Sequence, residues 1–130
     1  MKKISILLPV IFLISSCIVG KNAKTIDAIK QNVETVAKNN FGNGYKILFN
    51  KNYDYAVVYK KVKSAVGDKN MIKIMVYDCK NKEVLWGKKA IKAKLQWDGK
   101  YKLRINYITK AGKPATIVYD AKNKQVSYIQ

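Results

Sequence analysis

Hydrophobic and polar residues alternate with two different periods along this chain. Between residues 24 and 39 the apolar side chains recur every three or four positions. They are Ile26, Ile29, Val33, Val36 and Ala37. This spacing predicts an amphipathic helix at the start of the folded domain. Thr25 or Asn22 is the expected N-cap, and the segment Gly42–Gly44 is expected to end the helix.

The chain after Gly44 is typical of strands and turns. Tyr, Val and Ile dominate its apolar runs, and clusters of Asn, Gly, Asp and Pro separate them. We predict strands at Tyr45–Phe49, Tyr53–Val62, Met71–Tyr77, Val84–Trp86, Ile91–Trp97, Tyr101–Thr109, Ala115–Tyr119 and Gln125–Ile129. A helix packed on an antiparallel meander is an α+β fold. A small β-barrel or sandwich with an N-terminal helix is the alternative.

One predicted hairpin separates apolar from cationic side chains. A three-residue loop, Asp98–Lys100, pairs Trp97 with Tyr101 and keeps the apolar residues on one face. The other face then gathers Lys92, Lys94, Lys102 and Arg104, with Lys94 opposite Arg104, and Lys88 and Lys89 extend it. Such a face is either solvated or binds a polyanion, with an affinity that falls steeply as salt is added.

The first residues have the pattern of an export signal. Two lysines precede an apolar stretch, Ile4–Ile14, which is shorter than the roughly 20 residues of a membrane-spanning helix. The stretch ends in Ile14-Ser15-Ser16-Cys17, which resembles the lipobox of bacterial lipoproteins. The resemblance implies a signal peptide at 1–16, acyl chains such as palmitate on Cys17, a tether at 17–23 and one domain at 24–130. An ordinary signal peptide with an incidental cysteine is the alternative.

The lipobox also implies a location. A lipidated Cys17 anchors the exported protein to a membrane of the cell envelope. Ile18 follows this cysteine, whereas the inner-membrane retention signal of enteric-type bacteria has Asp there. We therefore expect the outer membrane where the cell has one.

Composition argues against catalysis. The chain has no His, which excludes imidazole bases, Ser-His and Cys-His pairs and His-ligated metal sites. Its carboxylates are scattered, and it has no Gly-rich phosphate loop. Without His to activate it, Cys79 is expected to be a small strand-end or loop residue. We predict no enzymatic activity, no cofactor, no metal and no small-molecule substrate.

The net positive charge is high, but only part of it is evidence of function. Lys and Arg number 26 against 8 acidic residues, for a formal net charge of +18. Arg104 is the single arginine. Lys, Asn, Ile and Tyr are all abundant and share A/T-rich codons, so base composition contributes to the excess. The charge therefore indicates an anionic partner only where the fold concentrates it.

A nine-residue motif occurs twice. The segment Val76–Val84 recurs 42 residues later as Val118–Val126. In each copy the Asp can accept hydrogen bonds from the turn, and Asn81 and Asn123 suit a left-handed position. The second copy, with its Gly112-Lys113 turn, resembles the terminal hairpin of PepSY-like domains, although Asn123 stands where that family usually has Gly. The resemblance implies a non-catalytic module that binds or inhibits a partner protein such as a protease.

Two binding functions follow from these patterns. A lipid-anchored module that binds an envelope or host protein is favoured, with Tyr53, Tyr55 and Tyr59 on one strand face and Trp86 nearby as candidate contacts. The same tyrosine pattern also fits the core face of a strand. The alternative is an envelope lipoprotein that binds a polyanion through its basic face. Teichoic-type polymers, lipopolysaccharide phosphate, nucleic acid and glycosaminoglycans are the ligands considered.

Overall fold

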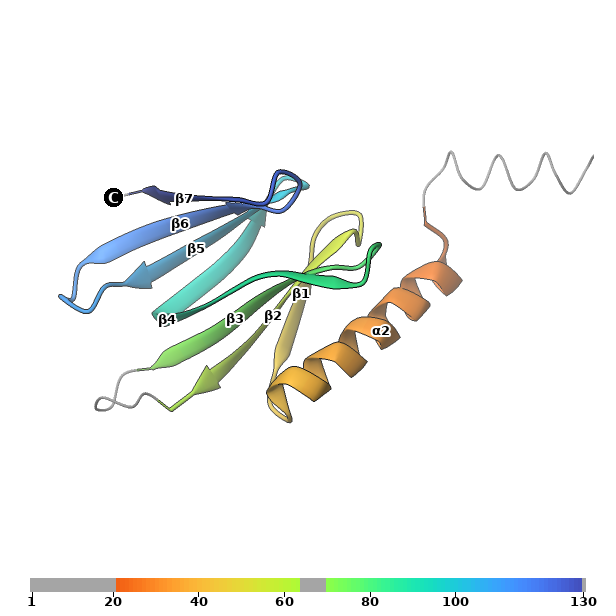
Figure 1. Cartoon of the computed structure of the whole chain (residues 1–130), viewed down its shortest axis with the longest axis horizontal. Coiled ribbons are helices and arrows are strands. Elements are labelled where there is room, and N and C mark those ends of the chain that lie inside the picture. The colour runs from red at the N-terminus through yellow and green to blue at the C-terminus, as the bar shows by residue number, and fades with distance from the viewer. Residues whose placement is uncertain (1–20, 64–69, 130) are drawn as a thin grey trace, which may run out of the picture.

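The computed structural model describes residues 21–63 and 70–129. They form one helix, α2 (Ala23–Phe41), and one seven-stranded antiparallel sheet (Figure 1). The predicted signal peptide and Cys17 lie outside the described residues. Within residues 21–63 and 70–129, no helix is long and apolar enough to cross a membrane.

Capping interactions define both ends of α2. The Asn22 side chain accepts a hydrogen bond from the Thr25 backbone N–H at 2.9 Å, so Asn22 is the N-cap. At the other end, Gly42 adopts a φ of 71° and donates its N–H to the Lys38 carbonyl. The predicted helix over 24–39 is therefore observed, two residues longer at its C-terminal end.

The strands follow one another as a simple meander. They are β1 (Lys46–Phe49), β2 (Tyr55–Val62), β3 (Met71–Asp78), β4 (Glu83–Asp98), β5 (Lys102–Ile108), β6 (Pro114–Asp120) and β7 (Gln125–Ile129). Each pairs antiparallel with the next, which confirms the predicted meander and α+β class. The two strands predicted at 84–86 and 91–97 are one continuous strand. Gly87 and Lys89 join them because they pair with Met75 and Lys73 of β3.

A bulge bends β4 and folds the sheet over on itself. The first half of β4 pairs with β3 as far as Ile91, and the second half pairs with β5 from Ile91 onward. At the bulge, Lys92 and Ala93 lie opposite Tyr107 alone. Figure 1 shows the result: β1–β3 and β5–β7 form two halves that share β4. The described sheet remains open, because β1 and β7 are its two edges.

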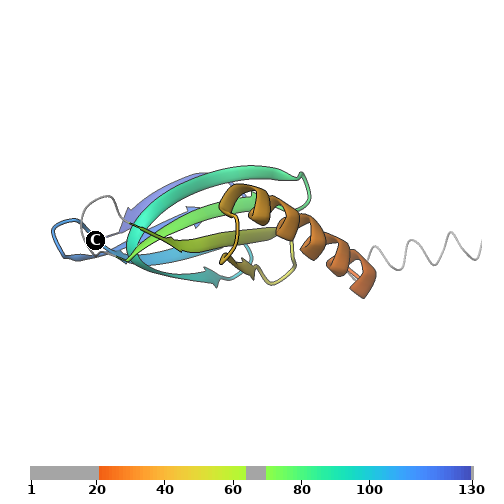
Figure 2. The same cartoon turned by 90° about the horizontal axis from the view of Figure 1, so that it is seen from below.

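Folding over creates two apolar layers. One lies between α2 and the first half of the sheet, and α2 covers the outside of β1–β3 (Figure 2). Its buried residues are Val33, Ala37, Phe41, Ala56, Val58, Met75, Tyr77 and Cys79. The other lies between the two halves and contains Val57, Ile74, Val76, Ala90, Leu103, Ile105, Ile117, Tyr119 and Ala121. Both faces of β2 and β3 are therefore buried, which explains their continuous apolar runs.

The two copies of the nine-residue motif form the same turn. Asp78 Oδ1 accepts hydrogen bonds from the backbone N–H groups of Lys80 and Asn81, both at 3.0 Å. Asp120 accepts the equivalent pair in the second copy. This confirms the predicted role of the aspartates. The prediction for the asparagines is wrong, because each Asn side chain donates to its Asp while the next residue, Lys82 or Lys124, takes the positive φ.

The two copies bury opposite faces of the sheet. Tyr77 packs under α2, and its hydroxyl donates to Asn32 Oδ1 at 2.9 Å. Tyr119, its counterpart, packs in the layer between the two halves and stacks on Trp86. The tyrosine of the first copy thus packs β3 against α2, and that of the second packs β6 against β4.

Candidate functional site

The β4–β5 hairpin has an odd loop, but two residues away from the predicted register. Trp97 pairs with Leu103 rather than Tyr101, and Asp98 pairs with Lys102. Tyr101 lies in the loop, and its ring packs against Tyr55, with centroids 6.2 Å apart. Since the shift is even, the apolar residues still share one face, as predicted.

The predicted basic face of this hairpin is partly neutralised. Arg104 faces Gln96, so the predicted pairing with Lys94 is wrong, and Arg104 Nε lies 2.9 Å from Asp98 Oδ2. Hydrogen bonds from Gln96 and Arg104 lower the pKa of Asp98. Lys102 lies between Asp98 and Asp120 in the ladder. Two of the four predicted cations therefore have carboxylate neighbours.

Asp120 is held as a carboxylate chiefly by its own turn. Hydrogen bonds from Asn123, followed by one from Lys122 and the charge of Lys102, keep the pKa of Asp120 below its ordinary value. The cation at Lys102 thus stabilises a turn carboxylate.

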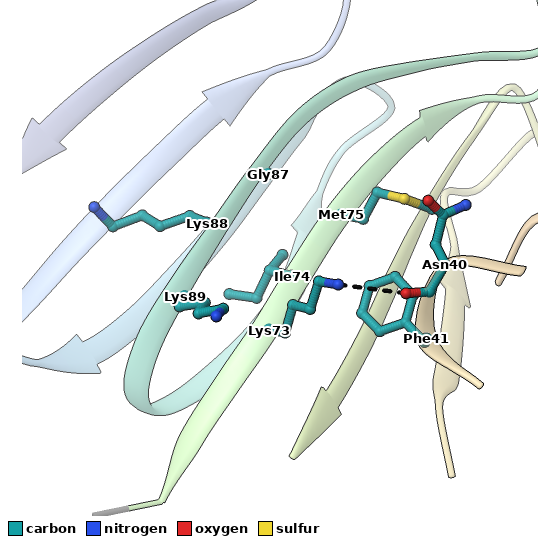
Figure 3. Close-up of a pocket in the computed structure, with 8 residues that line it drawn as sticks. All are labelled: Asn40, Phe41, Lys73, Ile74, Met75, Gly87, Lys88 and Lys89. Carbon is teal, nitrogen blue, oxygen red and sulfur yellow. Dashed lines mark hydrogen bonds between the residues drawn. The ribbon is translucent and has the colours of Figure 1, made fainter. Parts of the chain in front are cut away.

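Lys88 and Lys89 point to opposite faces because adjacent residues in a strand alternate. Lys88 pairs with Ile74 on the inner face, and its Nζ lies 5.6 Å from the centre of the Tyr128 ring. Lys89 pairs with Lys73 on the face that carries α2. The expectation that both extend one patch is therefore wrong, as their divergent side chains in Figure 3 show.

A shallow cavity of about 320 Å³ lies beside the end of α2 (Figure 3). Lys73 crosses it, donating to the Asn40 carbonyl at 3.3 Å, with its Nζ 4.7 Å from the centre of the Phe41 ring. Lys60 donates to the Phe41 carbonyl at 2.8 Å. Both lysines satisfy carbonyls at the C-terminus of α2, where the helix dipole favours cations. Their role here is structural.

Lysines occur at both ends of the folded sheet, whereas carboxylates gather at one end. The paired residues Val62, Met71, Ile91, Ile108 and Pro114 mark one end of the folded sheet. Nine lysines lie close to this row or in the connections beyond it: Lys60, Lys61, Lys63, Lys73, Lys89, Lys92, Lys94, Lys110 and Lys113. We call this region the lysine end. The described part of it contains no Asp or Glu.

The acidic residues gather at the opposite end. Asp54, Asp78, Glu83, Asp98 and Asp120 all adjoin the turns there. Asp27 and Glu34 lie on α2, and Asp68 falls in the segment 64–69, outside the described residues. We call the opposite end the mixed-charge end. The ion pairs found in the described chain lie there and join Lys21 to Asp54, Arg104 to Asp98 and Lys124 to Glu83.

Most of the predicted aromatic contacts are core contacts. Tyr55 and Tyr59 lie on β2 and pack against the inner apolar layer, and Trp86 stacks on Tyr119. Burial, followed by the charges of Asp78 and Asp54, raises the pKa of Tyr55. Tyr53 belongs to the β1–β2 turn, with a φ of 61°, so its predicted place on the same strand face is wrong.

Cys79 directly follows β3 and is buried, in agreement with the strand-end prediction. Burial, aided by the charges of Asp78 and Asp54, raises the pKa of its thiol to about 12. The thiol is therefore protonated at neutral pH. In the described part of the chain, no group of three or more Cys, Asp or Glu residues could hold a metal ion.

Sequence reasoning missed a groove beside the β4 bulge. It has a volume of about 390 Å³ and brings Lys92 and Lys94 next to Tyr107, Ile108, Pro114 and Ala115. The lysines come from one strand and the apolar residues from the two that follow it. The pairing of these three strands brings the residues together beside the bulge, and alternation of residue types does not reveal a bulge.

Comparisons with known protein families, characterised proteins and solved structures find no match to this chain. A functional proposal for it therefore rests on its fold and on the arrangement of its charges.

Proposed function

We propose that this chain is a non-catalytic binding module of the cell envelope, anchored through lipid on Cys17, that binds an anionic polymer through the lysine end. In this proposal an N-terminal amphipathic helix braces the sheet from outside. The observation that carries the proposal is the separation of charge: nine lysines share one end, and the described part of that end holds no carboxylate. A uniform excess of positive charge over the surface would not favour one end of the molecule for binding, whereas this separation does.

Seven of these lysines are exposed and available to a ligand. Lys60 and Lys73 are the two exceptions, since they bind carbonyls of α2. A polymer that contacts several exposed lysines releases its condensed counterions, which drives binding at low salt. Affinity should therefore fall steeply as the salt concentration rises.

The position of the anchor supports the same direction of binding. Lys21 Nζ lies 2.6 Å from Asp54 Oδ1, so the chain enters the domain at the mixed-charge end. Cys17 is four residues earlier in the sequence and within ~14 Å along an extended chain. The first half of β4, Glu83–Ile91, spans ~30 Å between the two ends, several times the Debye length of ~8 Å. The lysine end would face away from the anchoring membrane.

Retention on immobilised heparin, measured over a salt series, tests the proposal. The test variant carries Lys92→Gln, Lys94→Gln, Lys110→Gln and Lys113→Gln. The control carries Lys80→Gln, Lys82→Gln, Lys100→Gln and Lys122→Gln at the mixed-charge end, so both variants have the same net charge. We expect the test variant to elute at much lower salt. The slope of log affinity against log salt concentration should become shallower by roughly three. Equal losses in both variants would show that only net charge matters.

A partner protein, which the PepSY-like resemblance implies, is the second candidate. The observation that favours it is β7, an edge strand on which Tyr128 and Ile129 are 65% and 53% exposed. Such an edge can accept an added strand from a partner. A photoreactive residue at position 128 should then crosslink one specific envelope protein. Val126→Pro, which removes a backbone donor that faces away from β6, should abolish that crosslink.

A further inference from the structure

The groove beside the β4 bulge combines positive charge with apolar surface. Its volume of about 390 Å³ falls in the range of pockets that bind small ligands. Lys92 and Lys94 supply the charge, while the side chains of Ile108 and Pro114 supply apolar surface on the same face. The cavity beside the end of α2 also combines lysines with apolar surface, but Lys73 crosses it and already binds a carbonyl of the helix. Since Lys92 and Lys94 are exposed, the groove beside the bulge is where a ligand's shape can be read.

The groove is built by the bulge. Lys92 adopts a φ of 50°, which is uncommon for a residue with a side chain, and donates its N–H to the Asn70 carbonyl at 2.7 Å. The extra residue leaves Lys92 and Ala93 opposite Tyr107 alone. Bulges of this kind redirect side chains and often adjoin functional sites.

The polar groups of the groove include several hydrogen-bond donors. Lys92 and Lys94 are exposed and donate only. Thr116 Oγ1 donates to Asn106 Oδ1 at 2.9 Å, which occupies that amide oxygen and leaves the Asn106 N–H groups to donate. A matching ligand therefore carries an anionic, acceptor-rich group on a body with an apolar face.

We propose that this groove binds one acidic sugar ring of the anionic polymer, an inference that rests on the proposed function. The carboxylate or sulfate of the ring pairs with Lys92 and Lys94. The C–H face of the ring packs against the apolar surface of Ile108 and Pro114. A phosphate chain without rings gains the charge contacts only, so the site selects acidic polysaccharides over polyphosphate.

The test compares a short heparin oligosaccharide with polyphosphate of matched charge. The full chain is purified in a polyoxyethylene detergent, which carries no sugar. Ile108→Ala and Pro114→Ser each remove apolar surface from the groove without touching charge. Val84→Ala, at an exposed apolar residue near the start of β4, is the control. Circular dichroism checks the folding of each variant, so that either groove variant suffices if the other misfolds.

We expect Ile108→Ala and Pro114→Ser to weaken heparin binding about fivefold, the size expected for the loss of one or two buried methylene groups, and to leave polyphosphate binding unchanged. The Val84→Ala control should change neither. Equal effects on both polymers, or no effect on either, would overturn the sugar site while leaving the lysine end in place. If the unmodified chain retains neither polymer, the proposed function itself fails, and the sugar site with it.

Discussion

Trp86 and Tyr119 stack face to face, with ring centroids 5.0 Å apart and planes 12° from parallel. Trp86 lies in the first half of β4 and Tyr119 in β6, so this contact joins the two halves of the folded sheet. It also joins the two copies of the nine-residue motif, because Tyr119 belongs to the second copy and Trp86 follows the first. The packing of one half against the other should therefore depend on it.

Replacing Trp86 should weaken the whole fold. Trp86→Ala leaves a cavity between the halves and should lower the free energy of unfolding by about 3 kcal/mol. Val84→Ala is the matched control on the same strand, because Val84 is 51% exposed and should change stability by under ~0.5 kcal/mol. Urea unfolding followed by circular dichroism measures both. A Trp86→Ala variant as stable as the control would show that the halves do not rely on this stack.

The two motif tyrosines should respond in opposite ways to loss of the hydroxyl. The Tyr119 hydroxyl is buried and has no hydrogen-bond partner among the described residues, whereas the Tyr77 hydroxyl donates to Asn32. Tyr119→Phe should leave stability unchanged or raise it by up to ~1 kcal/mol, and Tyr77→Phe should lower it by ~1 kcal/mol. Denaturant titration of the two variants in parallel checks this. Equal losses would mean that Tyr119 has a partner in solution, such as an ordered water.

The two turn aspartates should differ in importance although their hydrogen bonds match. Asp78 is 4% exposed, while Asp120 is partly open to solvent. Asp78→Ala leaves part-buried N–H groups without an acceptor and should cost about 2–3 kcal/mol, against ~1 kcal/mol for Asp120→Ala, whose hydrogen bonds are exposed. Thermal unfolding of both variants measures the difference. The same cost at both sites would argue against burial as the cause.

Cys79 should make the fold sensitive to alkaline pH. Its thiol pKa is raised from 9.0 to about 12 in the folded chain, so the stability tied to the neutral thiol is complete below pH 9 and is lost as the pH rises from 9 toward 12. Cys79→Ala removes this dependence. The wild type should therefore lose stability relative to the Cys79→Ala variant over that interval. A constant difference between their free energies of unfolding would contradict the raised pKa of the thiol. In the native state at pH 8, thiol reagents should react slowly.

Anchoring should leave the lysine end free. The full lipidated chain, inserted into vesicles, should bind soluble heparin equally well whether the vesicles are zwitterionic or contain anionic lipid. In the proposed arrangement the mixed-charge end is the anchored one, which would keep the lysines well beyond a Debye length from the bilayer. Surface-captured vesicles and a heparin titration provide the measurement. Loss of heparin binding on anionic vesicles would show that the lysine end contacts the anchoring membrane.

Local patterns predicted most of the secondary structure. The strand Gln125–Ile129 is observed with the predicted bounds, and the helix differs by two residues at its C-terminal end and one at its start. These elements depend on periodicity and on turn residues, which are properties of neighbouring positions. The continuity of β4 was missed because Gly87 and the lysines beside it have weak strand preferences. Pairing with β3 overrides those preferences.

The candidate site was harder to predict than the fold. The sequence placed Lys94 and Arg104 together, but Arg104 binds Asp98, and Lys94 joins a groove with Ile108. A shift of two residues in one hairpin and a bulge at Lys92 account for the change. Neither change can be recognised from the alternation of apolar and polar residues. The shift of two residues is even, so each side chain keeps its face of the sheet.

The sequence by itself determined the period of each element, the two identical Asp turns and the size of the positive charge. These depend on residues close together in the chain. Only the tertiary structure decided where the charge lies. The meander sends alternate turns to opposite ends, and the acidic residues of the strand-end turns, such as Asp78 and Asp120, therefore gather at one end. The bend at Lys92 brings unpaired lysines and apolar surface together at the other, a result of long-range packing that no local pattern encodes.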